Sequence, residues 1–379
     1  MLIRTPKLDG PELKALDLIW QLQKSMSPML NEPHAWTGSL RRQSLAAAVQ
    51  SSNSIEGYVE SISNVHEILL NQNNPSVSRD NLAAIAGYRD AMTFVLQAIQ
   101  DDATLINESL IKALHFMLTK DDLQNRPGRY RIGSVYVHNE QNNEIVHEGA
   151  PAGDVGKLMQ ELIEELQQSR DYDALVTAAM AHLNLVMIHP FKDGNGRMAR
   201  VLQSFILGLA GTTSPIFMSI EEYLGQNTGR YYSVLADVGK GVWNSKREAR
   251  PWLRFILNAH YSQALRVQQN SRFAESSWAE VSRLVNQFKI DERVIPSLVH
   301  VLNGNALKNS TYIAISKDNG DVVSELTASR DLAKLVELDL LKAIGEARGR
   351  SYIGGRKLAE ISEKLKGEAG VRRPIDLFA

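Results

Sequence analysis

Apolar residues recur every three to four positions along most of the chain, which predicts a mainly α-helical protein. The first such stripe consists of Leu13, Leu16, Ile19, Leu22 and Met26. Helical patterns cover residues 11–25, 43–56, 61–71, 79–99, 152–168 and 173–188, and a further helix is expected from Asn195 to just before Gly211. Residues 263–284 are polar and rich in serine and glutamine, which suits either a connecting helix or a linker.

One short segment departs from the helical spacing. Between Pro127 and Pro151, apolar and polar residues alternate at Tyr130, Ile132, Val135 and Val137, and the alternation resumes at Ile145 after a polar loop. Alternation with a period of two is typical of a half-buried strand, so this segment is predicted to form a β-hairpin.

Composition narrows the class of protein. The length of 379 residues suggests two or three domains. There are 42 Lys and Arg against 43 Asp and Glu, so a role in coating a polyanion is not expected. The absence of cysteine excludes disulfides, thiolate zinc sites and cysteine nucleophiles, and it fits a reducing compartment. The first residues lack the apolar region of a secretion signal, and no long apolar run follows, so we expect a cytoplasmic protein without a membrane span.

Residues 189–200, HPFKDGNGRMAR, hold the densest group of chemically useful side chains. The glycines and the start of a new helix would let backbone N–H groups bind an anion. Arg197 and Arg200 lie on one helical face and can bind phosphate oxygens. Asp193 is a suitable Mg²⁺ ligand, and His189 can accept a proton from an attacking hydroxyl. This stretch is therefore predicted to be a phosphate site with its own base.

Other interpretations of this stretch are weaker. A glycine-rich turn with a stray histidine is common, but here all the relevant residue types occur together. No GxxxxGK[ST] motif is present, so P-loop ATP hydrolysis is not indicated. His182 and His189 are seven residues apart and could share a metal ion, but a third imidazole is not near them in the sequence. We expect His182 to be a packed, hydrogen-bonded helix residue.

The same stretch matches the signature of Fic proteins, HPFx[DE]GNGRxxR, at every fixed position. The predicted hairpin resembles the family's flap, which pins the target segment beside the active site. Tyr231-Tyr232 resembles the tyrosine pair that lines the adenine pocket. The resemblance covers about residues 40–262 and implies a Fic-type helical core. One position departs from it, because relatives often have an asparagine where this chain has Gly239.

The resemblance implies transfer of AMP from ATP to a Ser, Thr or Tyr hydroxyl of a target protein, with pyrophosphate leaving. His189 would be the base, Asp193 would hold Mg²⁺, and Arg197 and Arg200 would grip the β- and γ-phosphates. The implied nucleotide-binding residues are Asp193, Gly194, Asn195, Gly196, Arg197, Met198, Ala199 and Arg200 of the signature, Val135, Tyr136, Val137 and His138 of the flap, and Tyr231 and Tyr232.

Upstream, residues 52–57 read Ser-Asn-Ser-Ile-Glu-Gly. Taken alone, this segment is a helix end with a polar face. Beside the Fic signature it resembles the family's inhibitory motif, [ST]xxxE[GN], with Ser52 and Glu56 at its defining positions. The resemblance implies that Glu56 pairs with Arg200 and denies ATP its γ-phosphate site, since one guanidinium cannot serve both anions equally.

Residues 290–360 follow the order helix, helix, turn, helix and hairpin, with Thr327 as the expected N-cap of the third helix. This order and the basic residues near its end resemble a winged helix-turn-helix domain whose wing is 342–353. Such a domain binds DNA, or it docks proteins or forms a homodimer.

We therefore divide the chain into an N-terminal helical region (1–104) with the inhibitory motif, a Fic core (105–262), a winged-helix domain (271–362) and a tail (363–379). The favoured function is protein adenylylation of targets and of the chain itself, held in check by Glu56. Two alternatives stay open: a Fic-type enzyme that reverses the modification or transfers another phosphoryl or nucleotidyl group, and a DNA-binding regulator that senses ATP.

Overall fold

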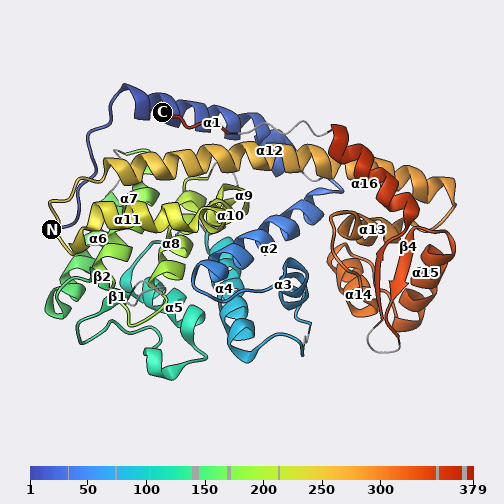
Figure 1. Cartoon of the computed structure of the whole chain (residues 1–379), viewed down its shortest axis with the longest axis horizontal. Coiled ribbons are helices and arrows are strands. Elements are labelled where there is room, and N and C mark those ends of the chain that lie inside the picture. Colours follow the sequence, from blue (N-terminus) through green and yellow to red (C-terminus); the bar gives the residue numbers. More distant parts are fainter. Residues whose placement is uncertain are drawn as a thin grey trace.

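The computed structural model is built mainly of helices, as the apolar spacing predicted (Figure 1). It describes residues 1–32, 34–72, 75–101, 103–138, 145–168, 172–211, 214–346, 350–368 and 374–379. Among the described helices, none combines the length and the apolar character that crossing a membrane requires.

The first five helices are α1 (Gly10–Asn31), α2 (Thr37–Ile55), α3 (Ile62–Leu69), α4 (Arg79–Ala98) and α5 (Glu108–Thr119). Three of them begin at a side chain that accepts a hydrogen bond from the first turn, namely Ser61, Ser78 and Asn107. The predicted apolar stripe of α1 is only partly right: Ile19 and Met26 are buried, whereas Leu13 is 54% exposed.

The predicted hairpin is confirmed as strands β1 (Tyr136–His138) and β2 (Ile145–Glu148), which pair antiparallel. A third strand, β3 (Gly241–Val242), adds to β2 in parallel and was not expected from the sequence. A short turn, η1 (Leu123–Asn125), precedes the hairpin, and a second, η2 (Ala152–Asp154), follows it. The next helices are α6 (Val155–Gln168), α7 (Ala174–Ile188) and α8 (Asn195–Leu209).

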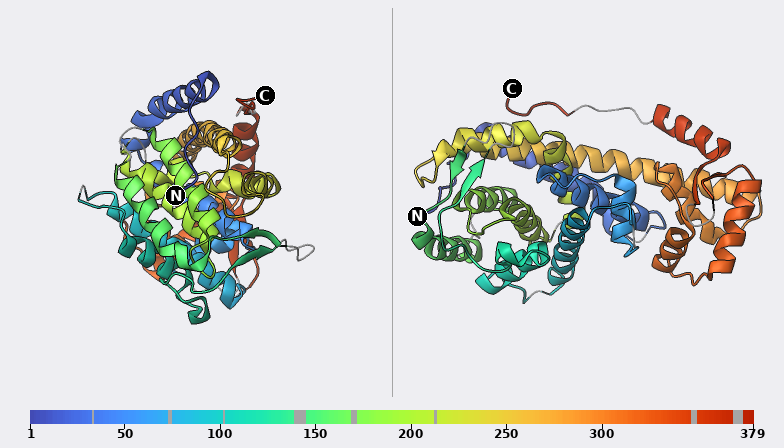
Figure 2. Two further views of the ribbon diagram at one scale, coloured as in Figure 1. Left: turned by 90° about the vertical axis from the view of Figure 1, so that its left-hand side faces the viewer. Right: turned by 60° about the horizontal axis from the view of Figure 1, so that its bottom comes forward.

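Three further helices, α9 (Pro215–Met218), α10 (Glu221–Gln226) and α11 (Thr228–Gly239), lead to α12 (Arg250–Gln287). Of the two possibilities for residues 263–284, the connecting helix is the one observed. With 38 residues, α12 is about 57 Å long and runs along nearly the whole molecule (Figures 1 and 2). The proposed boundary between residues 262 and 271 therefore falls inside one uninterrupted helix.

The C-terminal part follows the predicted order of elements. It contains η3 (Glu292–Val294), α13 (Ile295–Leu302), α14 (Asn309–Asp318), α15 (Glu325–Glu337), an antiparallel pair β4 (Leu341–Ile344) and β5 (Ser351–Gly354), and α16 (Arg356–Glu368). The predicted N-cap Thr327 is wrong, because the Ser324 hydroxyl accepts from the Thr327 N–H and begins α15 three residues earlier.

The buried apolar side chains of the described residues gather in three cores, and α12 contributes to each of them. Trp252 packs in the main core with α7 and α8, and Ala264 packs in a small core with α1, α2 and α9. Val281 packs in the core of the C-terminal part. Because a single rigid helix contributes to all three cores, it fixes the C-terminal part relative to the α7–α8 pair that carries the signature.

Candidate functional site

The signature begins where α7 ends. His189 is the C-cap of α7, with a left-handed backbone (φ 54°), and its N–H donates to the Leu185 carbonyl at 2.9 Å. Its Nδ1 lies 3.2 Å from the Val186 carbonyl oxygen. Because a carbonyl oxygen can only accept, Nδ1 carries the proton, and Nε2 keeps a free lone pair. His189 is thus held in the tautomer that a general base requires.

Burial lowers the pKa of His189 to about 4, although the hydrogen bond to Val186 opposes the shift. The positive charge of Arg131 and the neighbouring His147 lower the pKa further. At neutral pH the imidazole is therefore uncharged and can accept a proton.

The turn after His189 ends at Gly194, the N-cap of α8, whose left-handed backbone (φ 75°) is easily adopted only without a side chain. The Asp193 carboxylate accepts from the Gly194 N–H at 2.6 Å. The Asn195 side chain bonds back to Phe191, accepting from its N–H at 2.9 Å and donating to its carbonyl at 3.0 Å. Asn195 therefore shapes the turn with its side chain and has only its backbone to offer a ligand.

Both signature arginines are almost fully buried, at 3% exposed for Arg197 and 2% for Arg200. Arg197 lies over the ring of Tyr58 and donates to the Leu118 carbonyl at 3.4 Å. In Arg200, Nε donates to the Ser52 hydroxyl at 2.7 Å, and Nη2 donates to the Ser52 carbonyl at 3.0 Å. The predicted partner of Arg200 is in place as well, because Nη2 lies 2.6 Å from the Glu56 carboxylate.

Glu56 is the C-cap of α2, and Gly57 follows it with φ 85°, so the helix ends where the motif predicted. The Glu56 carboxylate lies directly against the Cα of Gly196, in the first turn of α8, where any side chain at residue 196 would clash with it. Burial lowers the pKa of Arg200, but the Glu56 carboxylate together with Tyr231 and Tyr88 raises it, and the net shift of this pKa is upward. The carboxylate thus occupies the N-terminus of α8, a position that attracts anions.

The side chains present fit a magnesium nucleotide. Among the described residues, Arg197 Nε and Arg200 Nη1 are buried donors without a partner, and such donors suit phosphate oxygens. The Asp193 side chain is 42% exposed and is the carboxylate nearest the turn. No cluster of three metal-binding side chains exists in the described part of the chain. Mg²⁺ would therefore need phosphate oxygens as well as Asp193, as is usual for this ion.

Some predicted site residues lie elsewhere. The side chains of Met198 and Ala199 are fully buried in the main core, which leaves their backbone to meet a nucleotide, and their place in the nucleotide site stays a prediction. Tyr231 is 1% exposed, and its hydroxyl lies 3.0 Å from His182 Nε2. Burial raises the pKa of Tyr231 to about 12. Tyr232 is half exposed and donates to the Ile55 carbonyl at 3.1 Å, next to Glu56.

His182 is the packed residue that the sequence indicated. It is fully buried, and its Nδ1 lies 2.7 Å from the Gln203 Oε1. Burial lowers the pKa of His182 to about 3, so it is neutral and engaged at both nitrogens. A metal site shared with His189 is therefore not formed.

Sequence reasoning missed three residues that hold the turn, namely His115, Arg131 and His147. His115 stacks on Phe191, with ring centroids 3.7 Å apart. Its Nδ1 accepts from the Gly128 N–H at 2.9 Å, and its Nε2 lies 2.9 Å from the Asp193 carbonyl. His115 could have been noticed in the sequence, because it is a single histidine among the apolar residues on one face of α5.

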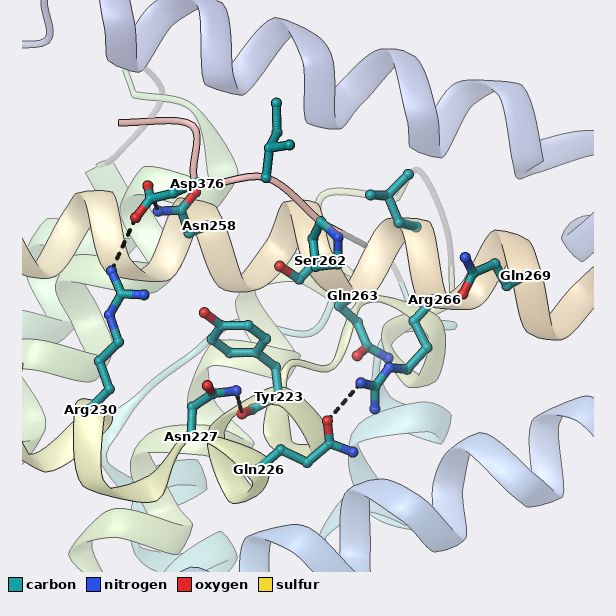
Figure 3. Close-up of a pocket in the computed structure, with 13 residues that line it drawn as sticks. Tyr223, Gln226, Asn227, Arg230, Asn258, Ser262, Gln263, Arg266, Gln269 and Asp376 are labelled. Carbon is teal, nitrogen blue, oxygen red and sulfur yellow. Dashed lines mark hydrogen bonds and ion pairs between the residues drawn. The ribbon is translucent and has the colours of Figure 1, made fainter. Parts of the chain in front are cut away.

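The structure also contains a polar cavity away from the signature. Figure 3 shows this cavity between α10, α11, α12 and residues 374–376. Its volume is about 440 Å³. Asp376 accepts from Asn258 at 2.6 Å and pairs with Arg230 at 3.3 Å, so the last residues are held against α12 (Figure 3). None of the signature residues lines this cavity.

Two kinds of sequence comparison with known proteins agree with each other. Residues 105–207 match the family described as Fic/DOC family. The chain is similar to the protein adenylyltransferase Fic of Culex quinquefasciatus, with 29% identity over 60% of this chain and 43% of that protein. It is 28% identical to the protein of the same name from Drosophila melanogaster, over 66% of this chain and 47% of that one. The chain thus spans less than half the length of these relatives.

Solved structures show the same fold. A Fic family protein from Desulfovibrio desulfuricans G20 matches with a TM-score of 0.57 at 20% identity, over 93% of this chain and 98% of that one. Fic-1 from C. elegans matches with a TM-score of 0.56 at 22% identity, over 70% of this chain and 73% of that one.

Proposed function

Because the chain carries a Fic domain over residues 105–207 and resembles proteins named protein adenylyltransferase Fic, we propose that it transfers AMP from ATP to a hydroxyl group of a protein. The observation that carries this proposal is that a base and an anion-binding site lie side by side. The free Nε2 of His189 belongs to the same turn as the N-terminus of α8, where the Glu56 carboxylate now lies.

In the proposed reaction, His189 Nε2 takes the proton of the target hydroxyl as its oxygen attacks the α-phosphorus of ATP. The new O–P bond forms while the bond between the α-phosphorus and the bridging oxygen breaks, and pyrophosphate leaves with the electron pair. The first turn of α8 and the two arginines stabilise the charge on the phosphates, which is the main work in this chemistry. Mg²⁺, held by Asp193 and the phosphates, would supply further charge neutralisation.

Glu56 acts as a brake in this proposal. A phosphate that approaches Arg200 must compete with a carboxylate 2.6 Å from the same guanidinium. The rate of transfer in the wild-type chain is therefore low, and modification of the chain itself is equally restrained. Reversal of the modification is the alternative for a chain with its glutamate in place.

The proposal extends to the location of the protein, the divisions of its chain, and the places of adenine and the target segment. We place the protein in the cytoplasm, and we treat residues 1–104, 105–262, 271–362 and 363–379 as its functional divisions. Adenine is assigned to the neighbourhood of Tyr232, since Tyr231 is enclosed in the core. The target segment would lie along β1, beside Val135, Tyr136 and Val137.

DNA binding by the C-terminal part is a second candidate, favoured by exposed basic side chains on α15 and β4. Arg330 and Lys334 share one exposed face of α15, and Lys342 is exposed on the neighbouring strand β4. In the described part of the chain, none of these three takes part in an ion pair. Arg348, also expected in the basic wing, lies outside the described residues. Arg330→Ala with Lys334→Ala should weaken a salt-sensitive gel shift of duplex DNA, and a full chain that binds no duplex at low salt would leave docking or dimerisation.

The test of the main proposal is incubation of the full chain with ATP labelled at the α-phosphate and a cell lysate. The parent is the Glu56→Gly variant, so that the brake is absent. His189→Ala in this parent should lower label transfer by about 10²–10⁴-fold while ATP affinity stays similar. ATP labelled at the γ-phosphate is the matched control, because adding the chain should leave no more label on protein than the lysate alone does. Transfer of the γ-label above the level of the lysate alone would assign a kinase, and near-normal transfer of the α-label by His189→Ala would exclude the proposed base.

A further inference from the structure

One buried guanidinium lies where the hairpin meets the end of α7. Arg131 is 6% exposed and belongs to the first leg of the hairpin. Its Nε donates to the His189 carbonyl at 2.7 Å, and Nη1 donates to the Gly133 carbonyl at 2.6 Å. Its Nη2 donates to the carbonyls of Ala150 and Ile188. The side chain therefore connects both legs of the hairpin with the residue proposed as the base.

These contacts complete the C-terminus of α7, where the last four carbonyls lack partners within the helix. The carbonyls of Leu185 and Val186 accept from the backbone and the side chain of His189. Met187 accepts from His147 Nε2 in β2 at 2.9 Å. Ile188 accepts from the Ala150 N–H at 3.1 Å and from Arg131. Residues of the hairpin and His189 itself thus form the cap of this helix.

The backbone of the hairpin follows the same turn. The Arg131 N–H donates to the Pro190 carbonyl at 3.0 Å, and the Gly149 N–H donates to the Val135 carbonyl at 3.2 Å. Gly149 permits this approach, because a Cβ there would lie 3.0 Å from the His189 Cβ and 3.1 Å from Arg131 Nη2. The hairpin therefore packs against His189 without an intervening side chain.

Arg131 is also a buried charge without a counter-ion. In the described part of the chain it takes part in no ion pair, and its charge is balanced only by carbonyl dipoles at the negative end of α7. A buried charge without a carboxylate partner is costly to maintain.

We propose that Arg131 is a positioning residue that holds the hairpin and His189 in one fixed arrangement. Through the His189 carbonyl it keeps that residue in its left-handed conformation, and through Gly133 and Ala150 it sets where β1 lies above the imidazole. This role rests on the proposed function, because it assumes that a target hydroxyl between β1 and His189 must be aligned. Only a planar, forked side chain can donate in all of these directions at once.

Substitution of Arg131 should therefore reduce transfer and leave nucleotide binding unchanged. In the Glu56→Gly parent, we expect Arg131→Met to lower label transfer by about 10²-fold, the usual effect of a misplacement near 1 Å. Arg131→Lys keeps the charge without the fork and should lower transfer by about 10-fold. The ATP dissociation constant, measured by calorimetry, should stay within about 2-fold, because none of the hydrogen bonds described for the Arg131 side chain reaches α8. Arg129→Met is the matched control, since Arg129 is exposed on the same leg.

A second readout separates positioning from general stability. ¹⁵N NMR of the His189 side chain should show the Nδ1–H tautomer in the wild-type chain and a mixture of tautomers in Arg131→Met. Added ethylguanidinium should partly restore transfer in Arg131→Ala. If Arg131→Met fails to fold, Gly149→Ala tests the same arrangement from the opposite leg and should lower transfer with unchanged ATP affinity.

Three results would overturn the role of Arg131: Arg131→Met at the parent's rate, an unchanged tautomer, or a loss of ATP affinity that accounts for the whole effect. A parent that transfers no label contradicts the proposed function instead, and the NMR comparison then decides the role of Arg131 by itself.

Discussion

At the scale of single residues, the state of Arg200 depends on two side chains of α2. Its guanidinium contacts the Ser52 hydroxyl, the Ser52 carbonyl and the Glu56 carboxylate, and only the last of these is an ion pair. Removing Glu56 frees one edge of the guanidinium, but the contacts to Ser52 remain. The two residues of the motif should therefore contribute unequally to the brake.

Glu56→Gly should raise AMP transfer by about ten-fold or more. A charge-assisted contact contributes about 1.5–3 kcal/mol, and each 1.4 kcal/mol corresponds to about ten-fold in rate. Ser52→Ala should raise transfer by less than about five-fold, because it removes one hydroxyl and leaves the Ser52 carbonyl in place. The measurement is label transfer over a range of ATP concentrations. The double variant Glu56→Gly with Arg200→Ala serves as the control and should lose the gain.

If Glu56→Gly is no more active than the wild type at any ATP concentration, Glu56 is a helix cap and not a brake. Higher ATP affinity without faster transfer would show that the brake acts on binding and not on the orientation of the phosphates.

At the scale of elements, the position of Glu56 depends on how α2 packs against α10. Gly225 of α10 lies against Ser51, and a Cβ at residue 225 would approach the Ser51 Cβ to 2.8 Å. A buried hydrogen bond also joins α10 to α4, since the Tyr88 hydroxyl of α4 donates to Glu221 of α10 at 2.9 Å. The placement of the brake is therefore a property of helix packing and not of α2 alone.

Gly225→Ala should move α2 by a few tenths of an ångström and weaken the contact between Glu56 and Arg200. We expect a rise in AMP transfer of a few-fold, smaller than that of Glu56→Gly, and a melting temperature lowered by about 2–4 °C. Gly229→Ala is the matched control, because nothing lies within 4 Å of a Cβ at that residue. Unchanged transfer together with an unchanged melting temperature would show that α2 tolerates the methyl group without moving.

At the scale of the whole molecule, the C-terminal part touches the helices that precede and follow the brake. His300 of α13 meets His66 of α3 edge to face, with ring centroids 5.2 Å apart. Lys308 pairs with Glu67 at 2.7 Å beside them, and the charge of Arg42 from α2 acts on both histidines. Burial lowers the pKa of His66 to about 4 and that of His300 to about 3.

This contact should make the protein less stable in mild acid. Because the folded-state pKa of each histidine lies below the unfolded value of about 6.5, the unfolded chain binds more protons as the pH falls. The stabilisation is complete above about pH 6.5 and is lost progressively towards pH 4. Each histidine should lower the free energy of unfolding by about 2 kcal/mol between pH 7 and pH 5. Urea unfolding at the two pH values should show a smaller difference for His66→Gln than for wild type, whereas exposed His34→Gln should behave like wild type. An equal difference in His66→Gln would contradict the assignment.

The sequence alone determined those features that depend on neighbours along the chain. The spacing of apolar residues predicted the helices and the β1–β2 hairpin, because side-chain direction follows a local period of 3.6 or 2 residues. The signature predicted a base and an anion-binding turn within twelve residues, and Gly194 and His189 have the backbone conformations that this turn needs. The end of α2 at Glu56 could also be predicted, because it depends on residues that are neighbours along the chain.

Only the tertiary structure decided which distant groups meet. Arg131 bonds to His189 across 58 residues, and Arg200 bonds to Ser52 across 148. Asn184 and Asn258 hold the backbone of Ile3 and Leu377 near the two ends of the described chain. The burial of Tyr231 and Met198 in the main core could not be predicted from the sequence either. Such contacts depend on how complete helices pack against one another, and no local pattern of side chains records which buried carbonyl a distant guanidinium will reach.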